Sequence, residues 1–240
     1  MRPIAAARAI RQLFATPDDT RYVFEVIEAL QGPSLVRLRA RLQKSEQGRQ
    51  LLAEQPDLVP LLKDREGLRA LPEGSLGRAY LAFVEGEGVT ADGLVSASTI
   101  SRQGDQAAEL RWIRNWLRDT HDLWHAVLGY EGDLVGEAAL LVGEAALLAF
   151  SHHQTRNIGV GMIATVAWFK LGRVTHRGLH ARHTIFDGRR LAKQTAWFVG
   201  VPWHQWLARP VEDVRRDLGV SRTAQYQPVR SHEVDMSLVA

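Results

Sequence analysis

DQAAELRWIRNWLRDTHDLWHAVL, from Asp105 to Leu128, is the stretch of this chain that sets the class of the fold. Apolar residues recur in it at the spacing of an α-helix, so the sequence predicts one long helix from Asp105 to Leu128. Gly129 to Asp133 then turns the chain, and Asp133 can cap a second helix from about Leu134 to His153. The two helices are therefore expected to lie antiparallel.

Outward from this stretch, helical spacing continues over most of the chain, and strand patterns are nearly absent. Only Gly93 to Ile100 could be extended, whereas Ser45 and Ser75 stand where side-chain caps would begin helices. The sequence predicts an all-α fold of roughly eight to ten helices in a single domain, 1–222, with a loose polar tail, 223–240. Further helices are expected over Arg2 to Ala15, Tyr22 to Leu30, Leu76 to Val84, Gly159 to Arg177, Gly188 to Val199, Trp203 to Ala208 and Val211 to Leu218.

The composition narrows the classes of protein that fit. The chain has 240 residues, of which 45% are hydrophobic and 24% are charged, as in a folded domain. It has no cysteine, so disulfides and thiolate metal sites are excluded, and any metal must be held by histidine and carboxylate side chains. The net charge of +3 does not suit a general nucleic-acid binder.

No segment of the sequence is expected to span a bilayer. The longest apolar run, Ala138 to Phe150, is interrupted by a glycine and a glutamate and is shorter than the roughly 20 residues that a spanning helix needs. The start, Arg2 to Ala15, is rich in arginine and alanine and free of acid, which is typical of a transit peptide. Because its apolar residues fall on one side of a helix, a first helix is the preferred interpretation.

Histidine and carboxylate residues gather at His121-Asp122-Leu-Trp-His125, followed after eleven residues by Glu137. On a helix His121 and His125 differ by about 40° and lie one turn apart, so both imidazoles can point at one ion. Asp122 lies about 100° from His121 and about 60° from His125, where it can bind the same ion from the flank or orient a histidine. The turn at Gly129 places Glu137 opposite His125. Two imidazoles with one or two carboxylates suit Zn, Fe(II), Mn or Co, and an open position would make the site catalytic.

Other interpretations of these residues stay open. His121 and His125 could be ordinary helix histidines. Glu144 lies about 10 Å beyond Glu137 along the second helix, and it either lines the same cavity or pairs with an arginine. His152 lies about 22 Å beyond Glu137, which is too far to share a metal.

Three weaker signals also have two interpretations each. The run from Ile158 to Leu171 alternates small and large residues, so it could wall a tunnel for an isoprenoid tail or be a tightly packed core helix. Histidines among arginines near the C-terminal third could bind a carboxylate or phosphate, or form a solvated basic face. These histidines are His176, His180 and His183. Late tryptophans could face a membrane interface or fill the core. These are Trp197, Trp203 and Trp206.

Three families with related motifs fit less well. Metal-dependent phosphohydrolases with a His-Asp pair need a histidine well upstream, and this chain has none before His121. Metalloproteases carry His-Glu-x-x-His, whereas here Asp122, with a shorter side chain, occupies the position of the general base. Di-iron bundles need two Glu-x-x-His units on separate helices, and this chain has one Asp-x-x-His unit.

The pattern as a whole resembles the coenzyme Q biosynthesis protein 4 family. The hallmark of that family is His-Asp-x-x-His, eleven residues and then Glu, and the chain matches it without a gap at His121, Asp122, His125 and Glu137. The resemblance covers roughly residues 16–220, and Glu144 is not part of the family pattern. Matching segments outside the hallmark are Leu71 to Tyr80 (LPEGSLGRAY), Arg118-Asp119, Gly129-Tyr130, Trp206 to Pro210 and Val214 to Gly219.

This resemblance implies an α-helical, membrane-peripheral protein with a divalent metal, often zinc, and an apolar pocket for a prenyl lipid. It implies that His121, Asp122, His125 and Glu137 bind the metal and carry the catalysis. The implied reaction is removal of the C1 carboxyl of a polyprenylated 4-hydroxybenzoate derivative in ubiquinone biosynthesis, coupled to or followed by hydroxylation at that carbon. The chain would then be a carbon-carbon lyase, a decarboxylase.

Two further functions remain as alternatives. The chain could be a non-catalytic scaffold that binds a prenyl lipid and organises the ubiquinone biosynthetic complex, or a stand-alone hydrolase that uses metal-bound water. The expected partners are the polyprenylated aromatic substrate, other ubiquinone-biosynthesis enzymes, the membrane surface and a second copy in a homodimer. The expected location is the cytoplasm at the bacterial inner membrane, or the matrix side of the mitochondrial inner membrane.

Overall fold

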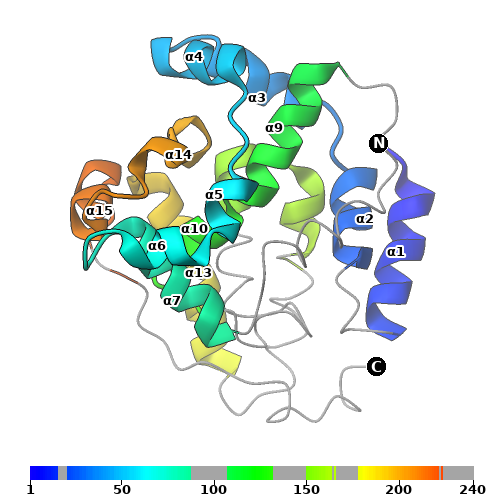
Figure 1. The fold of residues 1–240 in the computed structure, drawn as a ribbon. Coiled ribbons are helices and arrows are strands. Elements are labelled where there is room, and N and C mark those ends of the chain that lie inside the picture. The colour runs from blue at the N-terminus through cyan, green and yellow to red at the C-terminus, as the bar shows by residue number, and fades with distance from the viewer. Residues whose placement is uncertain are drawn as a thin grey trace. The chain divides into compact units, whose positions relative to one another are not determined.

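The structure is a computed structural model, and it describes residues 1–15, 21–87, 107–131, 150–163, 165, 178–221 and 223. Within these residues all regular elements are helical and none is a strand, which confirms the predicted all-α class. Thirteen helices have defined bounds in this part of the chain (Figure 1). They fall into two compact units, and each unit is assembled from separate stretches of the sequence. The predicted tail, 223–240, lies outside the described residues except for Thr223.

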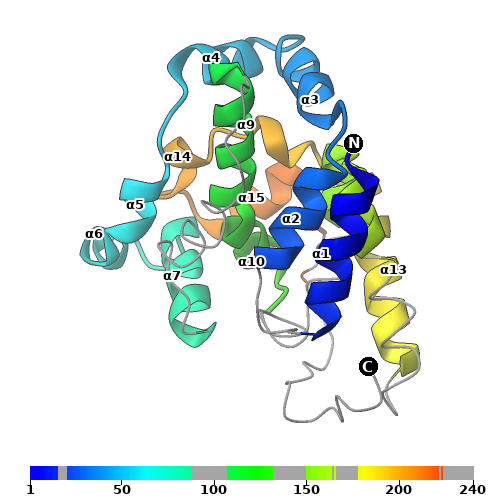
Figure 2. The ribbon, with the colours of Figure 1, turned by 90° about the vertical axis from the view of Figure 1, so that its right-hand side faces the viewer.

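The first unit comprises Met1–Gly32, Tyr130–Gln194 and Ala224–Ala240. Its described helices are α1 (Pro3–Ala15), α2 (Arg21–Ala29), the helical residues 150–155 and 158–163, and α13 (Gly178–Gln194). The helices α1 and α2 run side by side, as both ribbon views show (Figures 1 and 2). The predicted first helix is therefore confirmed. Residues 16–19, Thr-Pro-Asp-Asp, whose sequence predicts a cap with proline at the first helical position before α2, lie outside the described part.

Alanines and branched apolar side chains form a buried cluster in this first unit. Its members are Ala6, Ala9, Val26, Ala29, Leu30, Val160 and Ile163. Gly159 lies so close to α2 that a Cβ added there would be 2.7 Å from Ile27 Cα. Because alanine and glycine have little volume, the helix backbones can approach each other closely where these residues lie.

The second unit comprises Pro33–Gly129 and Thr195–Thr223. Its helices are α3 (Ser34–Leu42), α4 (Glu46–Glu54), α5 (Val59–Lys63), α6 (Arg65–Ala70), α7 (Leu76–Glu87), α9 (Ala108–Asp119), α10 (His121–Leu128), η1 (Phe198–Gly200), α14 (Trp203–Trp206) and α15 (Val211–Leu218). Ser45 caps α4 as predicted, since its hydroxyl accepts a hydrogen bond from Gly48 N at 3.0 Å. The hydroxyl of Ser75 accepts one from Arg78 N at 3.4 Å at the start of α7.

The C-terminal part of the second unit completes the start of α7. The first backbone N–H groups of a helix have no partner within it. In α7, Leu76 N donates to Arg209 O and Gly77 N donates to Leu207 O, both at 2.8 Å. In return Val211 N donates to Gly74 O at 2.8 Å. We call residues 207–211 the C-terminal clasp.

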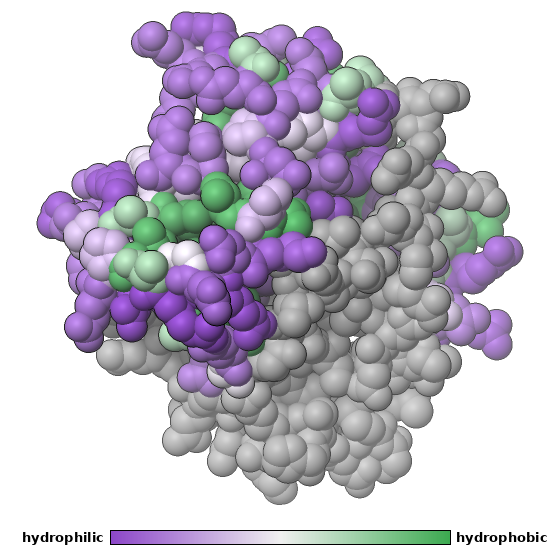
Figure 3. All heavy atoms as spheres, viewed as in Figure 1, coloured by the Kyte–Doolittle hydropathy of each residue, from purple (hydrophilic) through white to green (hydrophobic). Residues whose placement is uncertain are grey.

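Large aromatic side chains fill the core of the second unit. Trp116, Trp124 and Trp203 are almost completely buried. The indole N–H of Trp116 donates to Val199 O at 3.1 Å, and that of Trp203 donates to Phe198 O at 3.0 Å. Trp203 is therefore a core residue, and the membrane-interface interpretation is wrong for it. On the face shown in Figure 3, hydrophilic residues cover most of the described surface, with smaller apolar patches between them.

Several predicted helix boundaries differ from those of the structure, and a hydrogen bond accounts for two of the differences. The predicted helix from Asp105 to Leu128 is divided at Thr120 into α9 and α10. The predicted helix from Gly188 to Val199 corresponds to α13, which begins earlier, at Gly178, and ends at Gln194. There the chain leaves the helix because Ala196 N donates to Leu218 O at 2.8 Å. Among the described residues, no helix is both long enough and apolar enough to cross a membrane.

Candidate metal centre

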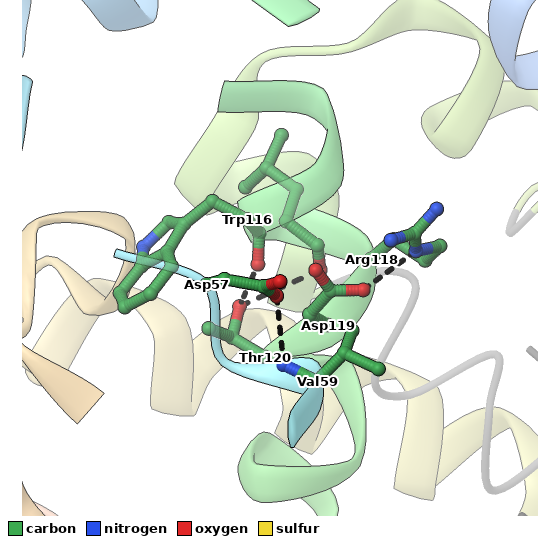
Figure 4. A network of polar contacts seen from close by, with 7 residues as sticks. Asp57, Val59, Trp116, Arg118, Asp119 and Thr120 are labelled. Carbon is green, nitrogen blue, oxygen red and sulfur yellow. Dashed lines mark hydrogen bonds and ion pairs between the residues drawn. The ribbon is translucent and has the colours of Figure 1, made fainter. Parts of the chain in front are cut away.

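The His-Asp-x-x-His motif forms the first turns of α10, directly after the break at Thr120. The Thr120 hydroxyl donates to Trp116 O at 2.8 Å (Figure 4), and a threonine that bonds back to the carbonyl four residues earlier often bends a helix. Asp119, the last residue of α9, is buried and forms an ion pair with Arg118 at 2.6 Å. Burial raises the pKa of the Asp119 carboxyl, Arg118 opposes that rise, and nearby Asp57 adds to it. The motif therefore begins a new helix and does not lie in the middle of a long one.

The two histidines of the motif converge, as their spacing predicts. His121 Nε2 and His125 Nε2 are 3.3 Å apart, and the ring centroids are 4.9 Å apart with the planes at 79°. His125 is 2% exposed, whereas His121 is half-buried at the start of the helix. Both side chains thus direct the same nitrogen at one point.

This distance fits the donor set of a metal ion. Two nitrogens that each lie about 2.0–2.1 Å from one tetrahedral zinc ion are about 3.3 Å apart. The same separation lets one neutral ring donate a hydrogen bond to the other when no ion is present. His121 and His125 therefore meet the geometric requirement for two ligands of one ion without rearrangement.

Of the carboxylates near the predicted site, the structure describes Asp122 but not Glu137 or Glu144. Asp122 is half-buried in the first turn of α10, where the helix dipole favours a negative charge. Glu137 and Glu144 both fall within 132–149, outside the described residues. Within the described ranges no group of three or more histidine, aspartate or glutamate side chains could hold a metal ion. Of the predicted four-residue site, the structure thus describes His121, Asp122 and His125, and it brings the two imidazoles together.

The helix α7 packs on α10 and presents two aromatic residues to the motif. The Phe83 ring is stacked on the His125 ring, with centroids 4.8 Å apart and planes at 15°. Tyr80, one helical turn earlier, is 1% exposed. Burial raises the pKa of the Tyr80 phenol well above its usual range, and the Asp122 carboxylate raises it further. Tyr80 therefore stays protonated beside the motif at neutral pH.

The far end of α10 is held by α15. Arg215 donates from Nε to Val127 O and from Nη2 to Ala126 O, both at 2.9 Å. Gly129 ends α10 in the left-handed conformation, with φ 76°. A cation at a helix C-terminus also interacts favourably with the helix dipole. Arg215 thus satisfies two carbonyls that α10 leaves open at its end.

The remaining predicted candidates belong to local contacts or lie outside the described residues. His152 Nδ1 is 2.7 Å from Asn157 O, so this ring is engaged within its own segment of the first unit. In the predicted lipid-tunnel segment, Val160 and Ile163 are core residues, while Ile158 and Met162 are exposed. Nothing is described for the side chains of His176, His180 and His183. Trp197 lies under the Arg41 guanidinium, 4.1 Å from its ring centroid, and Trp206 lies under that of Arg209, 4.3 Å away.

Three residues at the motif were not predicted as site residues. Tyr80 and Phe83 are three apart on a predicted helix, so the sequence does place them on one face. Nothing in the sequence says that this face meets His125. Arg215 is one of two arginines in its helix, and no local signal distinguishes it from Arg216.

Fold and site together define an all-α protein in which a His-Asp-x-x-His helix brings two imidazole nitrogens to one point. A family model described as coenzyme Q (ubiquinone) biosynthesis protein Coq4 matches residues 3–224. The chain belongs to this family.

Individual relatives agree with this assignment. The mitochondrial ubiquinone biosynthesis protein COQ4 of Yarrowia lipolytica is 30% identical over 222 residues, which are 90% of this chain and 79% of that protein. The mitochondrial COQ4 homolog 1 of Culex quinquefasciatus is 29% identical over 188 residues, which are 78% of this chain and 63% of that protein. A crystal structure of a candidate ubiquinone biosynthesis protein from Nostoc punctiforme matches with a TM-score of 0.67 at 21% identity. It covers 92% of this chain and 99% of that one, which shows a shared fold.

Proposed function

We propose that this chain acts in ubiquinone biosynthesis as a metal-dependent decarboxylase that removes the C1 carboxyl of a polyprenylated 4-hydroxybenzoate derivative. Membership of the Coq4 family supports the pathway. The observation that carries the metal-dependent chemistry is the 3.3 Å separation of His121 Nε2 and His125 Nε2. Zinc is the first choice of metal, and Fe(II), Mn and Co also suit such ligands.

In this proposal His121 and His125 bind the ion through Nε2, and Asp122 and Glu137 add the carboxylates. A bound divalent ion would hold the substrate carboxylate or phenolate and stabilise the charge that develops as CO2 leaves. Because each histidine must be neutral to donate a lone pair, its remaining proton lies on Nδ1. Protonation of either ring in acid would therefore compete with metal binding.

The reaction breaks the bond between C1 and the carboxyl carbon. The electron pair stays on C1, which takes up a proton in the simple route. In the oxidative route C1 becomes hydroxylated: dioxygen supplies one oxygen atom to C1, and an external two-electron donor reduces the other oxygen atom to water. Tyr80 is a neutral phenol at neutral pH, as an ordinary tyrosine is, so it adds no second negative charge beside Asp122 while the anionic substrate binds.

Partners and location follow from the same proposal. The substrate carries a long prenyl tail, so the protein would work at a membrane surface as a peripheral protein, together with other enzymes of the pathway and as a homodimer. The relatives from Yarrowia and Culex are described as mitochondrial. A bacterial chain would work at the inner membrane instead.

A carbon-dioxide release assay tests the proposal. The purified protein is loaded separately with Zn, Fe(II), Mn or Co and supplied with a prenylated 4-hydroxybenzoate labelled at the carboxyl carbon, with and without air. We expect labelled CO2 with at least one metal, and release at background level for His121→Ala and His125→Ala. Absence of labelled CO2 with all four metals contradicts the proposal that the chain is a decarboxylase.

The same variants separate the scaffold alternative from the enzyme. If wild-type protein binds metal and restores ubiquinone synthesis in a deficient strain, yet releases no CO2, the non-catalytic scaffold is favoured. If CO2 is released, and its release requires both the metal and the two histidines, the non-catalytic scaffold is excluded. A hydrolase would instead cleave an ester or amide substrate under the same metal conditions.

A further inference from the structure

One contact of His125 has no role in the metal chemistry itself. Phe83 lies face to face with the imidazole, with ring centroids 4.8 Å apart and planes only 15° from parallel. His125 is almost completely buried, so its ring is enclosed by neighbours and can turn only if they move. A turn of the imidazole about its Cβ–Cγ axis would drive a ring edge into the flat face of Phe83.

The orientation of this ring decides where its nitrogen points. His125 Nε2 lies 3.3 Å from His121 Nε2 only in the present plane of the imidazole. His121, in contrast, is half-buried and lies at the start of the helix. The stacked Phe83 ring thus faces the buried imidazole of the pair, that of His125.

The helix that carries Phe83 is itself fixed. Backbone hydrogen bonds from Leu76 and Gly77 to the C-terminal clasp anchor the first turn of α7. Tyr80 and Val84, on either side of Phe83 along the helix, are buried at 1% and 2% exposure. Phe83 therefore presents a flat aromatic ring to His125 from a helix whose first turn is held by hydrogen bonds.

We propose that Phe83 is a positioning residue that holds the His125 ring in the plane from which Nε2 can bind the metal. The inference rests on the proposed function, because it assumes that the histidine pair binds an ion. A ligand held in its binding orientation loses less freedom when the ion arrives, so the affinity for the ion is higher. Residues that orient a ligand without touching the ion typically contribute about 10- to 100-fold to affinity.

The test measures binding of Co(II) alone to the full-length protein, by its absorption spectrum and by titration. Phe83→Leu keeps an apolar side chain but removes the flat face, and Phe83→Tyr keeps the ring. Leu81→Ala, at a buried position of the same helix, serves as the matched control for general loosening of α7. Thermal unfolding of each metal-free variant records the change in stability separately.

We expect Phe83→Leu to bind Co(II) about tenfold more weakly, with an altered absorption spectrum. Phe83→Tyr should bind like the wild type, and Leu81→Ala should lose stability but keep the affinity. Equal affinity of Phe83→Leu and the wild type overturns the inference, as does an equal loss in Leu81→Ala. If the wild type binds no Co(II), or if His121→Ala and His125→Ala bind it as well as the wild type does, the metal site itself fails and the inference falls with it.

Discussion

Two helix contacts, one in each unit, are built from opposite kinds of side chain. In the first unit, Ala6, Ala9 and Gly159 lie between helices that come close because these residues are small. In the second unit, α7 meets α10 through the stacked rings of Phe83 and His125. At Gly159 the first contact leaves no room for an added side-chain atom. The second depends on the shape of two rings, so loss of a flat face should damage it more than a small gain in volume.

The largest effect on this comparison should come from Gly159→Ala in the first unit. The added Cβ would lie 2.7 Å from Ile27 Cα and 2.8 Å from Val26 O, and both are backbone atoms that cannot move aside alone. We expect the free energy of unfolding to fall by about 2–3 kcal/mol, as for overpacked cores, in urea denaturation.

Gly86→Ala in α7 is the matched control, since a Cβ there meets no atom within 4 Å. This substitution should leave stability unchanged or raise it by up to about 1 kcal/mol, because alanine favours helix over glycine. If both variants lose the same free energy of unfolding, the close approach of the backbones at Gly159 does not explain the sensitivity of the first contact.

An effect of intermediate size is expected at the end of α10. Arg215→Met removes the two hydrogen bonds to Ala126 O and Val127 O and leaves these carbonyls short of donors. We expect a loss of about 2 kcal/mol in the free energy of unfolding, since hydrogen bonds from charged groups contribute about 1.5–3 kcal/mol.

The neighbouring Arg216→Met provides the control. Arg216 is 70% exposed and pairs with Asp213 along the surface of α15. Its loss should cost no more than about 0.5 kcal/mol. If Arg216→Met destabilises the protein as much as Arg215→Met does, the hydrogen bonds to α10 do not account for the effect.

The smallest effect should be a pH dependence in the first unit. Burial lowers the pKa of His153, and the positive charges of Arg156, Lys193 and Arg189 lower it further. The unfolded chain therefore binds this proton more readily, so stability falls as the pH drops through the usual histidine value of about 6.5. His153→Gln should flatten the profile of unfolding midpoint against pH in this range.

At pH 8 the ring of His153 is neutral in both states, so its charge contributes nothing to the pH dependence there. The midpoint difference between wild type and His153→Gln measured at pH 8 therefore reflects packing alone. A difference that stays constant from pH 8 to pH 5 would contradict the prediction.

Much of the fold follows from local sequence. Helical spacing of apolar residues predicted the all-α class, and Val211–Leu218 was predicted with the bounds that α15 has. The meeting of His121 and His125 was predictable too, because residues four apart on a helix are neighbours. These features depend on residues close together in the chain.

The features of the fold that could not be predicted from the sequence depend on contacts between distant residues or on competing hydrogen bonds. The helix break lies at Thr120, whose hydroxyl bonds back to the preceding turn. Threonine also occurs within helices that do not break, so its presence in the sequence does not predict a break. The end of α13 depends on a bond between Ala196 and Leu218, and the stacking of Phe83 on His125 depends on how two helices pack. The roles of His121, Asp122, His125 and Glu137 as metal ligands remain predictions.

The C-terminal clasp has a consequence for how the protein is made. Leu76 and Gly77 find their carbonyl partners only at Arg209 and Leu207, which leave the ribosome more than a hundred residues later. A nascent chain that has already emerged through α10 still lacks the groups that anchor α7. The helix pair that carries Phe83 and His125 should therefore mature after translation is nearly complete, when the last helices arrive.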